Sequence, residues 1–290
     1  MNRHDLINWS IFIFLALIWG SSFILMKISS EGLTAVEIAA VRIFSAGLVF
    51  LPFSINHLHK LPSKKISLVI LTGVTGNLIP AFFFAEAIAN NIDSALAAIL
   101  NSLTPLFVVV LGILFFKLKI LPIKIAGVLV GLMGLVLLTL SQRNLHIDNL
   151  GYATLVLLAS ISYGFNVNLV SHFLKDVNPI HAATVSLAFM CLPTGSILWQ
   201  QDFFQTTLID HTLFWPIMAS VLLGVMGSAI ATAFFYILVK RAGGLFSSTI
   251  TYGIPFVAMG WGIIYNEEVT WVQVACLSVI LGGVYLTNKK

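Results

Sequence analysis

The chain has 290 residues, of which 59% are hydrophobic and only 9% are charged. A soluble domain covers its surface with about 25% charged residues, so this composition excludes a water-soluble globular protein and predicts an outer surface that faces lipid. The net charge of +4 could suggest an acidic partner. The distribution of the positive charges along the chain fits membrane topology instead, so we expect no nucleic-acid partner.

The first apolar run, from Trp9 to Ile28, is expected to be a retained helix and not a signal peptide. It is longer than the apolar core of a signal sequence and lacks a small-x-small cleavage site. Nine more runs follow, each near the roughly 20 residues that a membrane helix needs. Because none of them alternates like a barrel strand, all are predicted to be helices. The predicted spans are 9–28, 34–55, 66–88, 94–116, 121–140, 150–171, 180–199, 214–239, 245–265 and 270–287.

Two stretches of the chain, 94–116 and 244–266, nearly repeat each other at an offset of 150 residues. The gapless alignment places Pro105 on Pro255, Asn101 on Thr251 and Gly112 on Gly262. Such self-similarity predicts a duplicated unit, with five helices in 1–145 and five in 146–290. Because five is odd, the second copy must be inserted upside down. We therefore predict an all-α integral membrane protein of ten transmembrane helices, arranged as two inverted repeats around a central cavity.

Lys and Arg residues are distributed unevenly about these spans. With the N-terminus placed inside, 12 of the 15 lie on the cytoplasmic side, whereas Lys27 and Arg143 lie outside and Arg42 lies within a span. This bias follows the positive-inside rule and predicts that both termini are cytoplasmic. The short loops favour a multi-pass protein of a bacterial inner membrane. Cys191 and Cys276 lie in apolar runs and are expected to be small packing residues.

Several motifs resemble the EamA family of the drug/metabolite transporter superfamily. They are Ala16–Phe23 with Lys27, Ala40–Phe44 around Arg42, Ala97–Leu100 with Pro105–Phe107, the glycines Gly127, Gly131 and Gly134, and Glu268–Gln273. Each motif is weak alone, but their order over two copies is specific, and the resemblance covers almost the whole chain. It implies a basket of ten helices with a central cavity that moves small metabolites, often outward.

Polar side chains recur along one face of six predicted spans. In lipid they are costly unless they meet a partner or a water-filled cavity. Ser, Thr and Asn in membrane bundles also bond to backbone or to neighbouring helices, and this alternative stays open for each residue alone. As a set they favour a substrate cavity, with the predicted residues Trp19, Ser22, Asn77, Asn101, Tyr163, Asn166, Ser228, Thr251 and Tyr252.

Three prolines lie within predicted spans: Pro80, Pro105 and Pro255. Each removes a backbone donor and frees a carbonyl, so each is either a hinge or a fixed kink that packs. The fifth and tenth spans carry glycine stripes and few polar residues, and we expect them to pack closely.

Arg42 and Glu86 are the charged candidates for a functional role. Arg42 lies about two turns below the outer surface, without a counter-charge on its own helix face. Its partner is expected to be Glu37, Glu86 or a carboxylate of the substrate, and we favour a structural ion pair or snorkelling over direct substrate contact. Glu86 could bind the proton of a coupled antiport, but its place near a helix end favours plain solvation.

Motifs for energy coupling and catalysis are absent from the sequence. It contains no G-x-x-x-x-G-K-[ST] loop, which excludes ATP-driven pumping, and no zinc or nucleophile signature of an intramembrane enzyme. We expect no catalytic residue, no metal and no cofactor. The prediction is a secondary transporter, an exporter of small metabolites such as amino acids or amphipathic drugs, that works by alternating access. A passive channel for small solutes is the alternative, and an intramembrane enzyme is a weaker one. The expected partners are a small-molecule substrate and the lipid bilayer; the oligomeric state stays open, a monomer included.

Overall fold

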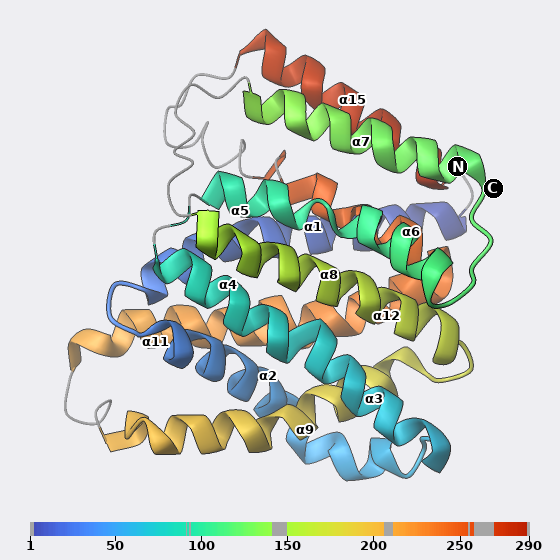
Figure 1. Cartoon of the computed structure of the whole chain (residues 1–290). Coiled ribbons are helices and arrows are strands. Elements are labelled where there is room, and N and C mark those ends of the chain that lie inside the picture. Colours follow the sequence, from blue (N-terminus) through green and yellow to red (C-terminus); the bar gives the residue numbers. More distant parts are fainter. Residues whose placement is uncertain are drawn as a thin grey trace.

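Helices make up all the regular secondary structure of the described chain (Figure 1). The computed structural model describes residues 3–90, 92, 94–140, 150–205, 211–254, 256–257 and 270–288. In chain order the elements are α1 (Arg3–Ser29), α2 (Ala35–Leu58), η1 (Ser63–Lys65), α3 (Ile66–Gly73), η2 (Val74–Leu78), α4 (Ile79–Ala89), α5 (Ser94–Asn101), α6 (Thr104–Leu114), α7 (Pro122–Leu140), α8 (Leu150–Phe173), α9 (Pro179–Gln200), η3 (His211–Leu213), α11 (Phe214–Leu222), η4 (Leu223–Ile230), α12 (Ala231–Ala242), α13 (Gly244–Ser248), η5 (Thr249–Gly253) and α15 (Trp271–Asn288).

Local chemistry sets several of these boundaries. The Thr34 hydroxyl accepts a hydrogen bond from the Glu37 amide at 3.3 Å, and the Glu37 carboxylate accepts one from the Thr34 amide at 2.8 Å. This capping box starts α2. The end of α12 is at Gly243, whose φ of 89° suits a residue without a side chain. The chain can therefore reverse there and enter α13 at once.

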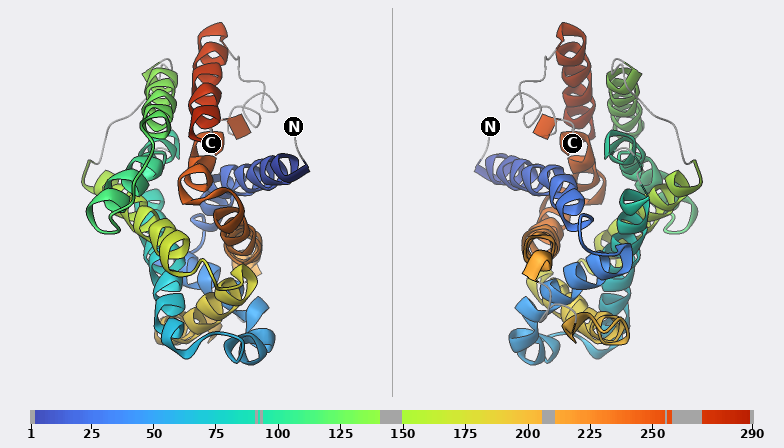
Figure 2. Two further views of the ribbon diagram at one scale, coloured as in Figure 1. Left: turned by 90° about the vertical axis from the view of Figure 1, so that its right-hand side faces the viewer. Right: turned by 90° about the vertical axis from the view of Figure 1, so that its left-hand side faces the viewer.

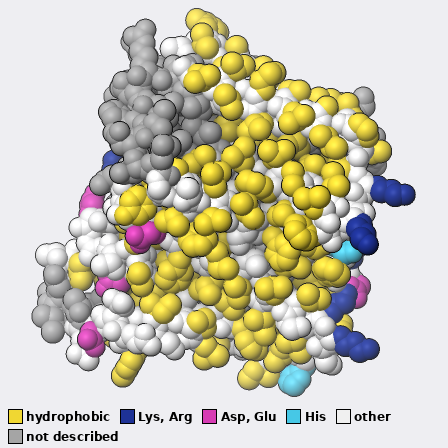
Figure 3. All heavy atoms as spheres, in the orientation of Figure 1, with side chains coloured by type: hydrophobic (Ala, Val, Ile, Leu, Met, Phe, Trp, Pro, Cys, Tyr) yellow, Lys and Arg dark blue, Asp and Glu magenta, His cyan; other side chains and the backbone are white. Residues whose placement is uncertain are grey.

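Six helical stretches are long and apolar enough to cross a membrane. They are Arg3–Ser29, Ala35–Leu58, Ser63–Ala89, Gly151–Phe173, Pro179–Gln200 and Phe214–Ala242. Apolar side chains cover much of the outer face seen in Figure 3. Many large apolar side chains of the protein are exposed, such as Leu140 at 73% and Leu192 at 73%. Such a surface is unfavourable in water and suits lipid. The protein is therefore an all-helical membrane protein over its described residues.

Close helix pairs organise the bundle (Figures 1 and 2). The α2 and α9 helices pack along each other, and so do α7 and α15, which lie together at one edge. The expected close packing of the glycine stripes is confirmed for α7 and α15: a Cβ on Gly127 would come within 2.8 Å of the Gly283 carbonyl oxygen, and one on Gly134 within 2.9 Å of the Ile280 amide nitrogen. Only glycine allows backbones to approach this closely.

Four of the predicted spans are interrupted near their middle. Between α3 and α4 lies the π-helical turn η2, and between α11 and α12 lies the π-helical turn η4. The α5 helix ends at Asn101 and α6 begins at Thr104, whereas α13 passes into the 3-10 helix η5. Interruptions of this kind free backbone carbonyls from the helical hydrogen bonds and are frequent at functional sites.

Charges separate between the two ends of the bundle. On the face of Figure 3, most Lys and Arg side chains gather at the end where both termini lie in Figure 1, and most acidic side chains gather at the other end. The Arg241 side chain donates to the Asn8 side chain at 2.9 Å, which places the start of α1 beside the end of α12. We call this the lysine-rich end, defined by Lys65, Lys175, Lys240 and Arg241.

Candidate cavity between the helices

A cavity of about 90 Å³ lies among the interrupted helices. Its walls come from both halves of the chain, through α1, α2, η2, α4, the α5–α6 junction, α8, η4, α12, α13 and η5. Most of the wall is apolar, with a few polar groups at defined places, as is usual for small-molecule sites. The lining residues that the sequence had singled out as cavity residues are Trp19, Ser22, Asn77, Asn101, Tyr163, Asn166 and Thr251.

The two other predicted cavity residues lie elsewhere. Ser228 is buried beside the cavity and accepts a hydrogen bond from Arg42. Tyr252 faces away: its hydroxyl donates to the Val128 carbonyl on α7 at 2.9 Å, and its ring packs on Gly131. Thr251 lines the cavity and Tyr252 does not, because the Tyr252 side chain is held against α7. The expectation that Tyr252 lines the cavity is therefore corrected.

Arg42 reaches the cavity from α2 and lies beside two hydroxyl groups. Its Nε donates to the Ser228 oxygen at 2.9 Å, and the Tyr163 hydroxyl is close enough to interact with the guanidinium electrostatically. The residue is only 9% exposed. Among the described residues, no carboxylate forms an ion pair with it. Glu37 is used in the capping box of α2, and Glu86 accepts from the Asn90 side chain at 3.0 Å. The ion pair expected for Arg42 therefore does not form with either glutamate.

Gly224 explains how η4 comes close enough to hold Arg42. A Cβ at this position would lie closer than 3.0 Å to both the Arg42 carbonyl oxygen and the Ser45 hydroxyl. The absent side chain lets η4 press against α2, and Ser228, about one turn further on, then meets the guanidinium. A glycine and a serine in the pattern Gly-x-x-x-Ser thus position the charge.

Asn77 and Asn166 differ in whether their side-chain amide donors have hydrogen-bond partners within the protein. Asn166 donates to the Thr72 carbonyl at 2.9 Å, so one of its roles is to bind α8 to α3. Asn77 accepts from the Thr232 hydroxyl at 3.0 Å. Its Nδ2 is buried and has no hydrogen-bond partner within the described chain. Because an unsatisfied buried donor is unfavourable, Asn77 offers the cavity a donor that a ligand or water would satisfy.

The break between α5 and α6 contacts the break between α13 and η5. Ser102, between α5 and α6, donates to the Thr251 carbonyl in η5 at 3.2 Å. Thr104 donates to the Asn101 carbonyl at 2.6 Å across the first break. Pro105 lies in the first turn of α6 and Pro80 in the first turn of α4. Both prolines therefore start new helical segments, where the missing donor does no harm. Pro255 lies outside the described residues.

Aromatic rings form much of the apolar wall. The Trp19 indole donates to the Gly227 carbonyl, which belongs to the π-helical turn η4, at 3.0 Å. Its ring lies 5.4 Å from that of Phe235, and the ring of Phe84 lies 6.3 Å from that of Tyr163. The sequence analysis missed Phe235 and Tyr236. The spacing of Tyr236 four residues after Thr232 was the signal that could have found Tyr236, since such residues share a helix face.

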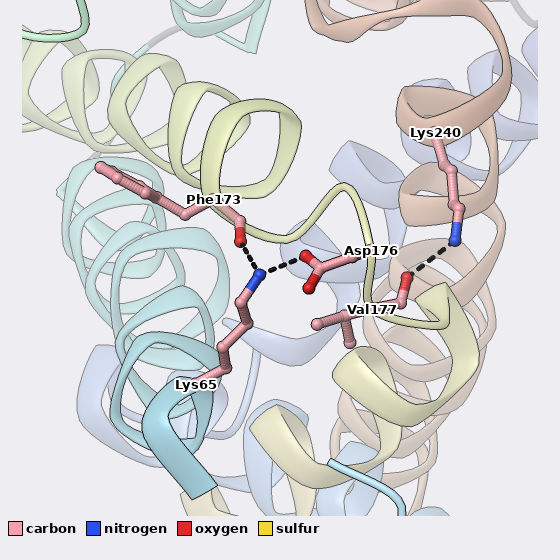
Figure 4. A network of polar contacts seen from close by, with 5 residues as sticks. All are labelled: Lys65, Phe173, Asp176, Val177 and Lys240. Atoms are coloured by element: carbon pink, nitrogen blue, oxygen red, sulfur yellow. Dashed lines mark hydrogen bonds and ion pairs between the residues drawn. The ribbon is translucent and has the colours of Figure 1, made fainter. Parts of the chain in front are cut away.

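A polar network closes the turn between α8 and α9 at the lysine-rich end (Figure 4). The Lys65 ammonium binds the Asp176 carboxylate and donates to the Phe173 carbonyl at 2.8 Å, and Lys240 donates to the Val177 carbonyl at 3.0 Å. The hydrogen bond from Lys65 lowers the pKa of the Asp176 carboxyl. Two cations from different helices thus hold one short turn.

A second pocket, of about 340 Å³, lies under this turn. It is lined by Lys175, Val177 and Lys240 among others, and it shares Tyr236 with the central cavity. The Tyr236 side chain is 1% exposed. It therefore stands between the central cavity and the lysine-rich end.

Within the described ranges, no three His, Cys, Asp or Glu side chains gather as a metal site would require.

A family model and several known proteins match this chain. The model of the EamA-like transporter family matches residues 7–140 and again residues 150–289. YedA of Escherichia coli K12, described as an uncharacterized inner membrane transporter, is 28% identical over 283 residues, which cover 94% of this chain and 88% of that protein. An uncharacterized transporter of Archaeoglobus fulgidus is 24% identical and covers 98% of this chain and 99% of its own length.

A plant relative and a solved structure extend the likeness. The chloroplastic WAT1-related protein At3g02690 of Arabidopsis thaliana is 24% identical over 97% of this chain and 69% of that protein. One crystal structure shares the fold with a TM-score of 0.66 at 18% identity, over 95% of this chain and 94% of the other. Since the family model accounts for most of the sequence in two consecutive matches, the protein belongs to the EamA-like transporter family.

Proposed function

We propose that the protein is a secondary transporter that exports small metabolites, such as amino acids or amphipathic drugs, by alternating access. The observation that carries this proposal is the cavity walled by both family-matched segments at the points where their helices are interrupted. Interrupted helices at a repeat interface are the usual surroundings of a transporter's substrate. Between these two kinds of substrate, the volume of about 90 Å³ favours small metabolites such as amino acids, because sites for drug-sized solutes are about 300–1,000 Å³.

Ten membrane crossings in two inverted units are part of the proposal. The matched interruptions support them: η2 and η4 are both π-helical, both contain glycine, and each lies in the third predicted helix of its unit. The positive-inside rule then assigns the lysine-rich end, and with it both termini, to the cytoplasm. The printed description of YedA supports an inner membrane location.

Alternating access requires a closure on each side of the cavity. At the lysine-rich end, Tyr236 and the network around Asp176 are the natural closure, since Tyr236 separates the cavity from the pocket under the α8–α9 turn. Release of that turn by Lys65 and Lys240 would join the two spaces. The cavity would then open to the cytoplasmic side.

Counterflow in proteoliposomes tests the proposal. Vesicles with the full-length protein are loaded with a panel of unlabelled amino acids and organic acids, and uptake of each labelled solute is followed against protein-free vesicles. Saturable uptake accelerated by internal solute is expected of a carrier. Ohmic conductance without counterflow would instead indicate the passive channel, and the absence of both for every solute would refute transport by this chain.

A matched pair of variants links transport to the cavity. Gly227→Leu adds bulk to a cavity wall, where a Cβ would already lie 3.3 Å from the Ser22 hydroxyl. Gly282→Leu adds the same bulk on α15, where a Cβ would have no neighbour within 4 Å. We expect the first variant to abolish counterflow and the second to preserve it. Equal transport by the two variants would remove the cavity from the pathway.

A further inference from the structure

Arg42 is a buried cation that faces the cavity and has no acidic partner in the described part of the protein. From this we infer that the cavity recognises its solute through a carboxylate, which binds the Arg42 guanidinium. The inference rests on the proposed transport function and names the chemical class of the substrate. It reverses the preference for a structural ion pair that the sequence alone suggested.

The hydroxyls around Arg42 orient its charge without neutralising it. Ser228 is a neutral acceptor, and the Tyr163 hydroxyl beside the guanidinium carries no charge either. A guanidinium has five N–H donors arranged as a planar fork, and these two contacts leave donors available. Removing a charge from water is costly unless an opposite charge replaces the hydration. A carboxylate suits this position because it can accept two parallel hydrogen bonds from such a fork.

Asn77 supplies an independent second observation. The residue lines the same cavity and is 7% exposed. Its Nδ2 is buried and lacks a partner within the described residues, while its Oδ1 accepts from Thr232. An unsatisfied amide N–H in a cavity that already holds a cation calls for an acceptor on the ligand and not for a further donor.

The rest of the wall defines the body of the solute. Trp19, Phe84 and Phe235 present aromatic surface, and Met26 and Ile254 add aliphatic surface. Arg42 is the only charged residue among the described lining residues. A single cation suits a monocarboxylate with a short apolar chain better than a polyanion. Since no acidic side chain lines the described wall, an amino group on the solute is not required for recognition.

Binding measurements with three small probes of one carbon skeleton test this assignment. The probes are 3-methylbutanoate, its neutral amide 3-methylbutanamide, and valine. Full-length protein in nanodiscs is titrated at pH 7 by saturation-transfer NMR, which measures weak affinities, with empty nanodiscs as the blank. We expect the acid to bind at least about tenfold more tightly than the amide, as is typical for hydrogen bonds to a charged group. Valine is expected to bind no more than a few-fold better than the acid.

Two charge-removing variants then separate recognition from structure. Arg42→Gln should weaken the acid at least about tenfold and leave the amide unchanged, and retained amide binding shows that the cavity is still formed. Lys27→Gln removes an exposed cation from α1 and should change neither affinity. If Arg42→Gln does not fold, Arg42→Lys keeps the charge without the planar fork and should retain part of the preference for the acid.

Defined results would overturn the inference. Equal affinity of the wild-type protein for acid and amide would do so without any variant, and so would a full acid preference in Arg42→Gln or the absence of binding by all three probes. The proposed function fails separately, through counterflow. Counterflow of any solute of the panel together with equal acid and amide binding would leave transport standing and remove only the carboxylate site.

Discussion

Gly224 gives a sharp test of how α2 and η4 fit together. In Gly224→Ala the new Cβ would meet the Arg42 carbonyl oxygen and the Ser45 hydroxyl at less than 3.0 Å, a separation that Cβ atoms essentially never show. The carbonyl belongs to a helix and cannot rotate away, so the two helices must separate. Forcing extra atoms into packed structure costs about 1–3 kcal/mol.

A matched substitution on α15 separates this clash from intrinsic helix propensity. Gly282→Ala adds the same methyl group where a Cβ has no neighbour within 4 Å, so it should gain up to about 1 kcal/mol from the better helix former. Both variants share this gain, so their stabilities should differ by the cost of the clash, roughly 1–3 kcal/mol. Separation of η4 from α2 should also break the bond between Ser228 and Arg42.

Size-exclusion thermostability in detergent measures both variants. The apparent unfolding temperature of Gly224→Ala should fall clearly below that of the wild type, and that of Gly282→Ala should equal or exceed it. Ser45→Ala combined with Gly224→Ala should rescue only part of the loss, since the carbonyl contact remains. A Gly224→Ala protein as stable as Gly282→Ala would refute the close packing of α2 on η4.

Three further predictions concern the hydroxyl contacts, the closure and the topology. Tyr252→Phe should lower the free energy of unfolding by about 0.5–1.5 kcal/mol, because one hydrogen bond is removed, and should leave counterflow unchanged. Reduced counterflow in this variant would contradict the placement of the Tyr252 ring outside the cavity. Tyr163→Phe should weaken binding of the acid probe. Asp176→Asn should raise the accessibility of the cavity from the lysine-rich end to thiol reagents. Because its lysine partner lowers the pKa of Asp176, the ion pair holds above the carboxyl's ordinary pKa and is lost as the pH falls through the lowered value, so the wild type at that pH should behave like the variant. A cysteine at Lys64 should react with an impermeant reagent only from the cytoplasm, and one at Glu31 only from outside; reaction of both from one side would exclude the predicted crossing of the bilayer by α2.

The amino-acid sequence alone determined where the helices lie and what surrounds them. Apolar runs of about 20 residues specify membrane helices because the backbone must bond internally in lipid. The glycine stripes of the fifth and tenth spans predicted helices that approach their neighbours closely, and the structure shows that these two helices pack on each other. Pro80 and Pro105 marked places where helical segments restart, because proline lacks a backbone donor. Arg42 also stood out, as an arginine within an apolar span always needs an explanation.

The tertiary structure decided which groups meet. Sequence spacing tells which residues share a face of one helix, but not how each helix is rotated about its axis or which helix it faces. The Tyr252 side chain therefore faces α7, whereas Tyr236, which the sequence analysis missed, lines the cavity. Arg42 lies beside Ser228 and Tyr163 from the second half of the chain, and not beside a glutamate nearby in sequence. Such partners are set by packing across many residues, where small glycines permit close approach and larger side chains forbid it, and no local pattern contains that information.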